Sequence, residues 1–177
     1  MKKILVFIIT ILLVTGCSND QPYELVRNDL AKYQNLDSDM MNQLKNVLKE
    51  ETTLDKDQKE KYKALMIKQY QHMNYQLVSE DINKDEAIIN VEIEVYNYLS
   101  SLISSLEYKK ENEEKFHDSD GNFDQSKFIT YQLQQLKSVT ARERYLVSYI
   151  LKKENKTWEI VEYPEYIVDK LHGFHHD

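Results

Sequence analysis

The sequence predicts an α+β domain in which three helices precede a β-hairpin, followed by two further helices, a second hairpin and a short last helix. Two observations support this order. The spacing of apolar residues changes from a helical period to strict alternation, and it does so twice along the chain. Glycine occurs only three times and proline only twice, so long regular elements joined by short connections are expected.

The first part of the domain, residues 23–73, has a helical period throughout. It divides into three helices, because Asp37 or Ser38 can cap a second helix and Thr53 or Asp55 can cap a third. The three apolar stripes are Tyr23, Val26, Leu30 and Tyr33; Met40, Leu44, Val47 and Leu48; and Tyr62, Leu65, Met66, Gln69 and Met73. Methionine at this spacing is typical of a packed core.

Strict alternation begins at residue 75 and predicts the first hairpin. In its first strand, Tyr75, Leu77 and Ser79 alternate with Gln76, Val78 and Glu80. The stretch Asn83-Lys84-Asp85 supplies the turn. In the second strand, the apolar face carries Ile89, Val91, Ile93 and Val95, and the other face carries Asn90, Glu92, Glu94 and Tyr96. One buried face and one solvent-exposed face are typical of an antiparallel sheet.

Helical spacing returns after this hairpin, at Leu99, Leu102, Ile103 and Leu106. The charged run 109–115 is expected to be the solvated end of this helix. After a loop, Asp124 or Ser126 begins another helix. Its apolar stripe consists of Ile129, Leu133, Leu136 and Val139 or Thr140.

Residues 142–153 alternate again and predict a third strand. Its apolar face carries Tyr145, Val147, Tyr149 and Leu151. Leu146 and Ile150 lie on the opposite face, which would allow this strand to be covered on both sides. The turn 154–156 then leads back into a fourth strand, where Trp158 is expected to be a core residue.

The first 17 residues have the pattern of an exported protein. Two lysines precede an apolar stretch, residues 4–15, which is shorter than the roughly 20 residues needed to span a membrane. The last four residues, Val14-Thr15-Gly16-Cys17, resemble the lipobox of bacterial lipoproteins. This resemblance implies that a diacylglyceryl group is transferred to the thiol of Cys17 and that the chain is cleaved after Gly16. It places the protein at the extracytoplasmic face of the cell membrane, held by lipid.

The chain is therefore expected to consist of a signal peptide, residues 1–16, a lipidated tether, residues 17–25, and a single α+β domain, residues 26–177. Lipidation uses the only cysteine, which excludes a disulfide or a thiol nucleophile in the domain. The signal peptide carries two of the 23 basic residues, so residues 17–177 have a net charge of −9. A nucleic-acid partner is not expected, because such partners require a basic face.

The long hairpin 75–98 and the final hairpin ending in Asn155-Lys156-Thr157-Trp158-Glu159-Ile160-Val161 resemble those of the NTF2-like (cystatin-like) domains found in many Gram-positive lipoproteins. The resemblance covers roughly residues 26–171. It implies N-terminal helices packed on a curved antiparallel sheet around a cone-shaped cavity, with a helical insertion between the two hairpins. In that family the cavity is an active site in some members and core in others. A Gram-positive source also fits the richness of the chain in Lys, Asn, Ile and Tyr.

The acidic loop 117–124 resembles a calcium-binding EF-hand loop, which has a glycine at its sixth position. When Gly121 is placed there, Phe116 and Lys127 fall on the first and twelfth positions, where carboxylates are required. The loop is therefore expected to be a turn with Gly121 at positive φ and with Asp124 capping the next helix.

The last helix is expected to begin at Pro164 and to stop at Gly173. Asp169, His172 and His176 would share one of its faces, and two imidazoles with a carboxylate can bind zinc. Because Gly173 interrupts this helix and chain ends fray, a solvated tail is the expected state. No cofactor is predicted.

No nucleophile elbow, H-E-x-x-H motif, phosphate-binding glycine loop or S-x-x-K motif occurs in the sequence. Glu92, Glu94 and Tyr96 would face a cavity if the sheet curves around one; an exposed sheet face is the plainer interpretation. The expected function is that of a non-enzymatic binding or accessory lipoprotein that contacts a protein or small ligand near the membrane. The alternatives are an enzyme with an acid–base group in an NTF2-like cavity, and a metal-binding lipoprotein that uses the histidine tail.

Overall fold

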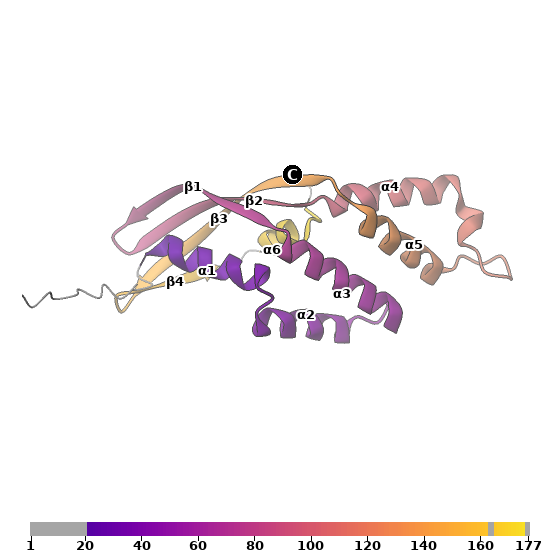
Figure 1. The fold of residues 1–177 in the computed structure, drawn as a ribbon, viewed down its shortest axis with the longest axis horizontal. Coiled ribbons are helices and arrows are strands. Elements are labelled where there is room, and N and C mark those ends of the chain that lie inside the picture. The colour runs from indigo at the N-terminus through magenta and orange to yellow at the C-terminus, as the bar shows by residue number, and fades with distance from the viewer. Residues whose placement is uncertain (1–20, 163–164, 176–177) are drawn as a thin grey trace, which may run out of the picture.

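The structure, a computed structural model, describes residues 21–162 and 165–175. In this part the chain forms an elongated α+β fold with six α-helices and four strands, which confirms the predicted class and order (Figure 1). The elements are α1 (Pro22–Gln34), α2 (Ser38–Glu50), α3 (Lys56–Gln71), β1 (Asn74–Asn83), β2 (Glu86–Tyr96), α4 (Tyr98–Glu111), the 3₁₀-helix η1 (Glu113–Phe116), α5 (Gln125–Ser138), β3 (Arg142–Glu154), β4 (Thr157–Glu162) and α6 (Glu165–His172). The predicted signal peptide, Val14, Thr15, Gly16, Cys17, Pro164 and His176 lie outside the described residues.

The helices begin where side-chain caps are available. The Asp37 carboxylate accepts a hydrogen bond from the backbone N–H of Asp39 at the start of α2. Asp55 and Gln58 form a reciprocal capping box at the start of α3. The first helix begins at Pro22, because proline fits the first helical position. Residues 22–25, which the sequence analysis places in the tether, therefore belong to α1.

The four strands form one antiparallel sheet in the order β1-β2-β3-β4. The β3–β4 hairpin turns at Asn155 and Lys156, both at positive φ, which matches the twist of the paired strands. The register of β1 against β2 shifts between Leu77 and Ser79. This bulge changes the predicted alternation of β1, because Ser79 is placed opposite the polar-face residue Asn90 and no longer shares a face with Leu77.

One face of the sheet packs on α1 and α6 and forms the first of two cores, here called the sheet core. It is made of Val26 and Leu30 from α1, Ala87, Ile89, Val91, Ile93 and Val95 from β2, Tyr145, Val147, Tyr149 and Leu151 from β3, Trp158 from β4, and Ile167 and Leu171 from α6, with Met73. The predicted apolar faces of β2 and β3 are confirmed, and so is the burial of Trp158, which is 4% exposed. Aromatic and branched side chains fill this face of the sheet.

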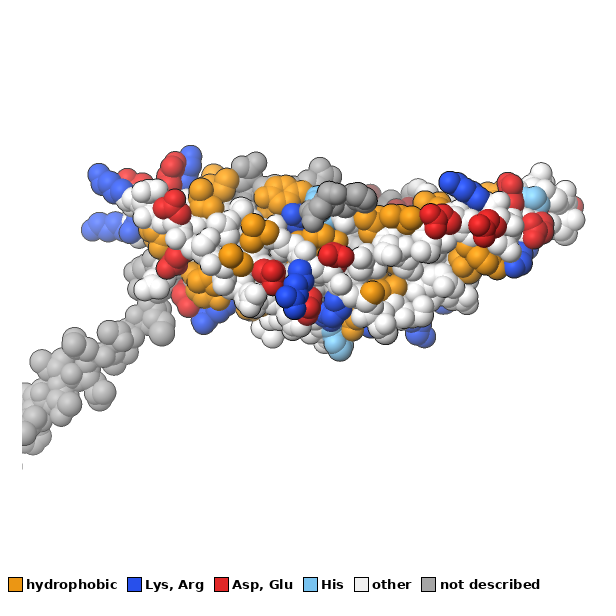
Figure 2. All heavy atoms as spheres, turned by 90° about the horizontal axis from the view of Figure 1, so that it is seen from above, with side chains coloured by type: hydrophobic (Ala, Val, Ile, Leu, Met, Phe, Trp, Pro, Cys, Tyr) orange, Lys and Arg blue, Asp and Glu red, His pale blue; other side chains and the backbone are white. Residues whose placement is uncertain are grey.

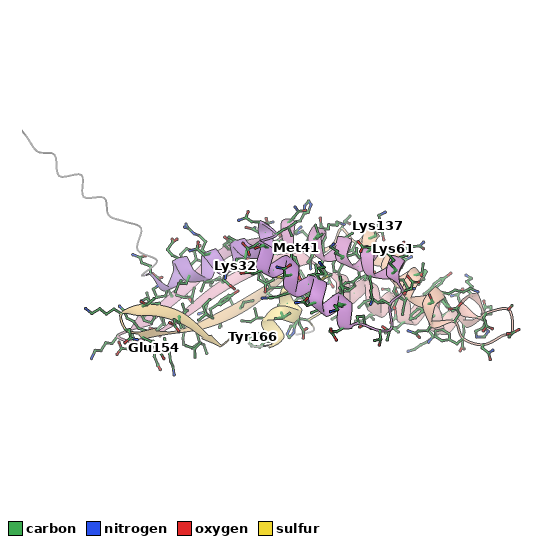
Figure 3. All side chains as sticks on the ribbon, turned by 90° about the horizontal axis from the view of Figure 1, so that it is seen from below. Lys32, Met41, Lys61, Lys137, Glu154 and Tyr166 are labelled. Carbon is green, nitrogen blue, oxygen red and sulfur yellow. The ribbon has the colours of Figure 1, made fainter. Side chains whose placement is uncertain are left out.

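The second core, here called the helical core, lies among α2, α3, α4 and α5. Its buried members are Met40, Leu44, Leu48, Leu65, Met66, Tyr70, Tyr98, Ile129, Leu133 and Leu136. The expectation that all N-terminal helices pack on the sheet is therefore wrong for α2 and for most of α3. The reason is that the helical insertion has an apolar face of its own, and α2 and α3 cover it. Figure 3 shows the result from below, with Met41 on α2, Lys61 on α3 and Lys137 on α5.

The helix predicted from Leu99, Leu102, Ile103 and Leu106 is confirmed as α4, but it is turned differently than that stripe suggests. Tyr98 and Ser105 are its buried residues, whereas Ile103 and Leu106 are 41% and 48% exposed. Ser105 tolerates burial because its hydroxyl donates to the backbone oxygen of Ser101.

Two buried glutamines join parts of the chain that are distant in sequence. Gln58 donates from Nε2 to the backbone and hydroxyl oxygens of Ser126, which fixes the start of α3 against α5. Gln69 accepts from the backbone N–H of Tyr96 and donates to its carbonyl oxygen, at 2.9 and 3.1 Å. Gln69 therefore satisfies a backbone pair at the end of β2, where the sheet meets the helices.

The C-terminal segment, residues 173–175, contacts both the sheet core and the helical core. Gly173 ends α6 at φ +76° and its carbonyl oxygen accepts from the backbone N–H of Leu99. Phe174 packs into the helical core, and the hydroxyl of Tyr145 donates to the carbonyl oxygen of His175. Within residues 21–162 and 165–175, no helix has the length and apolar content that a membrane crossing requires.

Candidate functional site: the open face of the sheet

The face of the sheet turned away from α1 and α6, here called the open face, carries a strip of exposed aliphatic side chains. The strip consists of Ile88 from β2 and Leu146 and Ile150 from β3. Val78 from β1 and Val161 from β4 are exposed at the register shifts of the two outer strands. The five side chains are between 39% and 54% exposed. Ile88 and Ile150 are direct cross-strand partners. Figure 2 shows the molecule from this side, with hydrophobic side chains lying between charged groups.

The strip arises from local features of the strands. Alternation along β3 sends Leu146 and Ile150 to the face opposite the buried Val147 and Tyr149. In β1 and β4, Val78 and Val161 stand at the two places where the register shifts, and such bulges redirect side chains.

The prediction that β3 can be covered on both sides is wrong for the described part of the chain. The helical insertion leaves β2 at the end of the sheet, and α4 and α5 continue the long axis of the molecule instead of folding back over the strands (Figure 1). Leu146 and Ile150 consequently stay exposed. Exposed aliphatic side chains grouped on one face of a sheet are typical of an interaction site.

A polar ladder crosses the strip and ties three strands together. The hydroxyl of Ser148 donates to Asn90 Oδ1 at 2.6 Å, and Asn90 Nδ2 donates to the hydroxyl of Ser79 at 2.9 Å. These polar side chains hydrogen-bond to one another across the three strands. Part of their hydrogen-bonding capacity is therefore satisfied without a ligand.

Next to the ladder on the open face, Glu92 and Glu94 belong to a cluster of polar and charged side chains. Glu92 accepts from Gln76 Nε2 at 2.9 Å, and Glu94 accepts from Asn74 Nδ2 at 3.0 Å and from Arg144 Nε at 3.1 Å. These bonds hold the pKa of Glu94 below its usual range, and the bond from Asn74 has the largest effect. A carboxylate with this pKa stays ionised at neutral pH and does not suit the role of a proton donor.

The structure thus brings Glu92 and Glu94 together, but on a solvated face with a hollow of only about 170 Å³ beside them. The plainer of the two sequence interpretations, an exposed sheet face, is confirmed for both. Tyr96 is linked to Glu94 through Arg142, whose guanidinium carbon lies 4.9 Å from the centroid of the tyrosine ring and whose Nε lies 3.2 Å from the Glu94 carboxylate. The Tyr96 ring also stacks on Tyr98, with 6.0 Å between ring centroids, and Lys68 Nζ lies 4.4 Å from its centroid.

The proposed zinc ligands are not brought together in the described residues. His172 turns into the protein, where its Nε2 lies 2.8 Å from the hydroxyl oxygen of Tyr70, while Asp169 is exposed. The positive φ of Gly173 ends the helix that His176 would have to continue. In the ranges 21–162 and 165–175, no three His, Cys, Asp or Glu side chains are grouped as a metal site requires.

The Tyr70–His172 pair was not anticipated, because its members come from α3 and α6 and neither belongs to a local motif. Burial raises the pKa of Tyr70. Burial also lowers the pKa of His172, an effect that the charge of Asp169 partly opposes. The pair therefore joins a neutral phenol to a neutral imidazole in the native protein at neutral pH.

We expect His172 to make the domain less stable in mild acid. Its folded-state pKa lies below the ordinary value of about 6.5, so the unfolded chain binds a proton first as the pH falls. The contribution is therefore fully favourable above about pH 6.5 and is lost as the pH falls toward the folded-state pKa. His172→Gln can accept the Tyr70 hydrogen without titrating. Urea unfolding between pH 5 and 8 should show a shallower pH slope for this variant than for the wild type.

The control for this measurement is His72→Gln, because His72 is exposed at the end of α3. It removes an imidazole without touching the buried pair. If His172→Gln and His72→Gln have the same effect, then the buried pair is not the source of the acid sensitivity.

The loop 117–124 is a turn, as predicted. Gly121 has a φ of +82° and Asp124 caps α5 through the backbone N–H of Lys127. The Asp118 carboxylate accepts from the backbone N–H groups of Asn122 and Asp120, and the bond from Asn122 is the first cause of its lowered pKa.

No model of a known protein family and no curated protein matches the sequence. One solved structure is similar over part of its length, the 2.62 Å crystal structure of ycdA, a candidate lipoprotein from Bacillus subtilis subsp. subtilis str. 168. The two sequences are 14% identical, and the TM-score is 0.42 over 68% of this chain. The chain spans 38% of the length of that structural neighbour.

Proposed function

We propose that this chain is a lipid-anchored, extracytoplasmic protein that binds a protein partner through the open face of its sheet, without catalysing a reaction. The observation that carries the proposal is the aliphatic strip, because Ile88, Leu146 and Ile150 are exposed on the face of the sheet that α1 and α6 leave uncovered. The apolar surface of a partner would remove these side chains from water, and burial of apolar surface contributes about 25 cal/mol for each Å².

The filled sheet core also favours binding over catalysis. In an NTF2-like enzyme the space between sheet and helices would hold the reacting groups, whereas here Tyr149 and Trp158 occupy it together with aliphatic side chains. An NTF2-like fold itself remains part of the proposal. It is supported by the order of the elements and by the packing of α1 against the antiparallel sheet.

The location is proposed from the first 17 residues. A short apolar stretch followed by Val14-Thr15-Gly16-Cys17 is the arrangement expected of a lipoprotein of a Gram-positive cell membrane. Attached acyl chains contribute about 0.8 kcal/mol for each methylene that enters the bilayer, so two chains hold a protein far longer than one.

The open face can be tested by photo-crosslinking in living cells. A photoreactive amino acid at Leu146 or Ile150 should give a crosslinked product of defined mass, because both side chains point from β3 toward the proposed partner. The same amino acid at Asn46, which is exposed on α2, is the matched control and should give none. A product of twice the mass of the chain would identify the partner as a second copy.

Equal crosslinking at Asn46 and Leu146, or none at either strand position, would contradict the open-face proposal. Unchanged thermal unfolding of the labelled variants must accompany the result, so that a loss of folding is not mistaken for a loss of binding.

The lipid anchor has a separate test. Cys17→Ser should abolish metabolic labelling with palmitate, because the sequence contains no second cysteine. Ser18→Ala, one residue further on, should leave the labelling intact. Undiminished labelling of the Cys17 variant would overturn the proposed anchor while leaving the open face to be judged by the crosslinking experiment.

A further inference from the structure

A second candidate site lies in the helical half of the molecule, away from the open face. It is a groove of about 380 Å³ bounded by α2, the α2–α3 connection, α3, α4 and α5. Its volume lies in the lower part of the range for small-molecule sites, about 300–1,000 Å³. It is therefore large enough for a small organic ligand.

The floor of the groove is apolar. Leu48, Ile129 and Leu133, which belong to the helical core, form its deeper part, and the largely exposed Val47 stands at its rim. Such a floor can hold the apolar body of a ligand, because every methylene moved from water onto it contributes about 0.8 kcal/mol.

The charge in the groove has one sign. Glu51 is the one charged side chain among the described residues that line it. Two hydrogen bonds from Thr53, through its backbone N–H at 2.6 Å and its hydroxyl at 2.7 Å, hold the Glu51 carboxylate in place. These bonds, with a smaller effect from the charge of Lys59 outside the lining, keep the pKa of Glu51 below its usual range. The group is therefore ionised at neutral pH.

Two further features add to the attraction for a cation. Glu51 caps the C-terminal end of α2, where the helix dipole places partial negative charge. The lining also includes the aromatic side chains of Tyr62 and Phe174, and aromatic faces attract alkylammonium groups. Tyr62 lies near enough to Glu51 that the carboxylate raises the pKa of its phenol, after the larger effect of burial.

We propose that this groove binds an amphiphilic organic cation, with the cationic head beside Glu51 and the apolar body along the floor of Leu48, Ile129 and Leu133. An anionic amphiphile of the same length is disfavoured, because no lysine or arginine belongs to the described lining. The inference is independent of the open face, which lies on the sheet.

The test uses residues 18–177, which contain every described element and lack only the signal peptide and the lipidated cysteine. Decyltrimethylammonium, kept below its critical micelle concentration, is titrated and followed by the methyl NMR signals of Val47, Leu48 and Ile129. Decyl sulfate is the anionic counterpart of equal chain length. We expect the cation to bind at least about fivefold more tightly than the anion, as a partly solvated ion pair allows.

Three variants make the result specific. Glu51→Gln should remove most of the difference between cation and anion, whereas Glu50→Gln, at an exposed neighbouring glutamate, should retain it. Val47→Lys adds a positive charge at the exposed rim and should weaken binding of the cation. Equal affinities for the two probes, or a Glu51→Gln variant that behaves like the wild type, would overturn the proposal. Leu146→Glu on the open face should leave the titration unchanged, so failure of the groove and failure of the open face are told apart.

Discussion

Gly173→Ala is expected to destabilise the domain by about 2–5 kcal/mol. At the φ of +76° that Gly173 adopts, a residue with a Cβ atom is disfavoured by roughly 1–2 kcal/mol. The added carbon would also collide with the backbone oxygen of Tyr96 and lie 2.5 Å from Gln69 Nε2. Overpacking of this kind costs about 1–3 kcal/mol, and neither neighbour can withdraw easily, because the two are hydrogen-bonded to each other.

Thermal unfolding measures this effect directly, since a loss of this size lowers the melting temperature by roughly 4–20 °C in a domain of this length. Gly121→Ala is the matched control. Gly121 has a similar φ of +82°, but no atom lies within 4 Å of an added Cβ. Gly121→Ala should therefore lose only the part of the stability that comes from the positive φ, roughly 1–2 kcal/mol. Equal shifts for the two variants would mean that the contact with Tyr96 and Gln69 does not limit the size of residue 173.

Trp158→Ala should destabilise the domain by about 3–5 kcal/mol, the usual loss for truncation of a buried aromatic side chain. Trp158 is 4% exposed in the sheet core, and Lys153 Nζ lies 5.3 Å from its ring. Since natural domains are stable by roughly 5–15 kcal/mol, this loss is a large part of the total. Val161→Ala, at an exposed residue of the same strand, should change the stability little.

Trp158 also provides an optical measurement, because it is the only tryptophan in the chain. Its emission should be blue-shifted in the native protein and should move to longer wavelength in denaturant. Red emission from the folded protein, together with quenching by iodide, would contradict the burial of the indole ring.

The sequence was sufficient to predict the order of the elements, because the apolar period changes sharply at each boundary and polar residues such as Asp55 and Asp124 mark the helix starts. It was also sufficient for the buried faces of β2 and β3, where alternation is uninterrupted. The sequence did not predict which residues of β1 share a face. The bulge between Leu77 and Ser79 changes the alternation, and no residue pattern there marks it.

The candidate site could be predicted only in part. Glu92 and Glu94 were recognised as lying on the polar face of β2, but Leu146 and Ile150 looked like residues that a further layer would cover. Whether such a layer exists depends on the direction in which the insertion leaves the sheet, which is a tertiary property. The roles of Gln58 and Gln69 were inaccessible for the same reason, because each binds a segment distant in sequence.

The start of α1 at Pro22 limits the distance between the fold and the proposed lipid on Cys17. Only four residues separate Cys17 from Pro22, and the five steps from one Cα atom to the next span at most about 18 Å. The chain enters the fold at the end that carries the turns of both hairpins (Figure 1). If Cys17 carries the proposed lipid, the sheet end of the elongated fold would lie nearer the membrane than the end formed by η1 and the loop before α5. The strands run along the long axis of the molecule (Figure 1), so in that arrangement the open face would be accessible to other proteins of the same membrane.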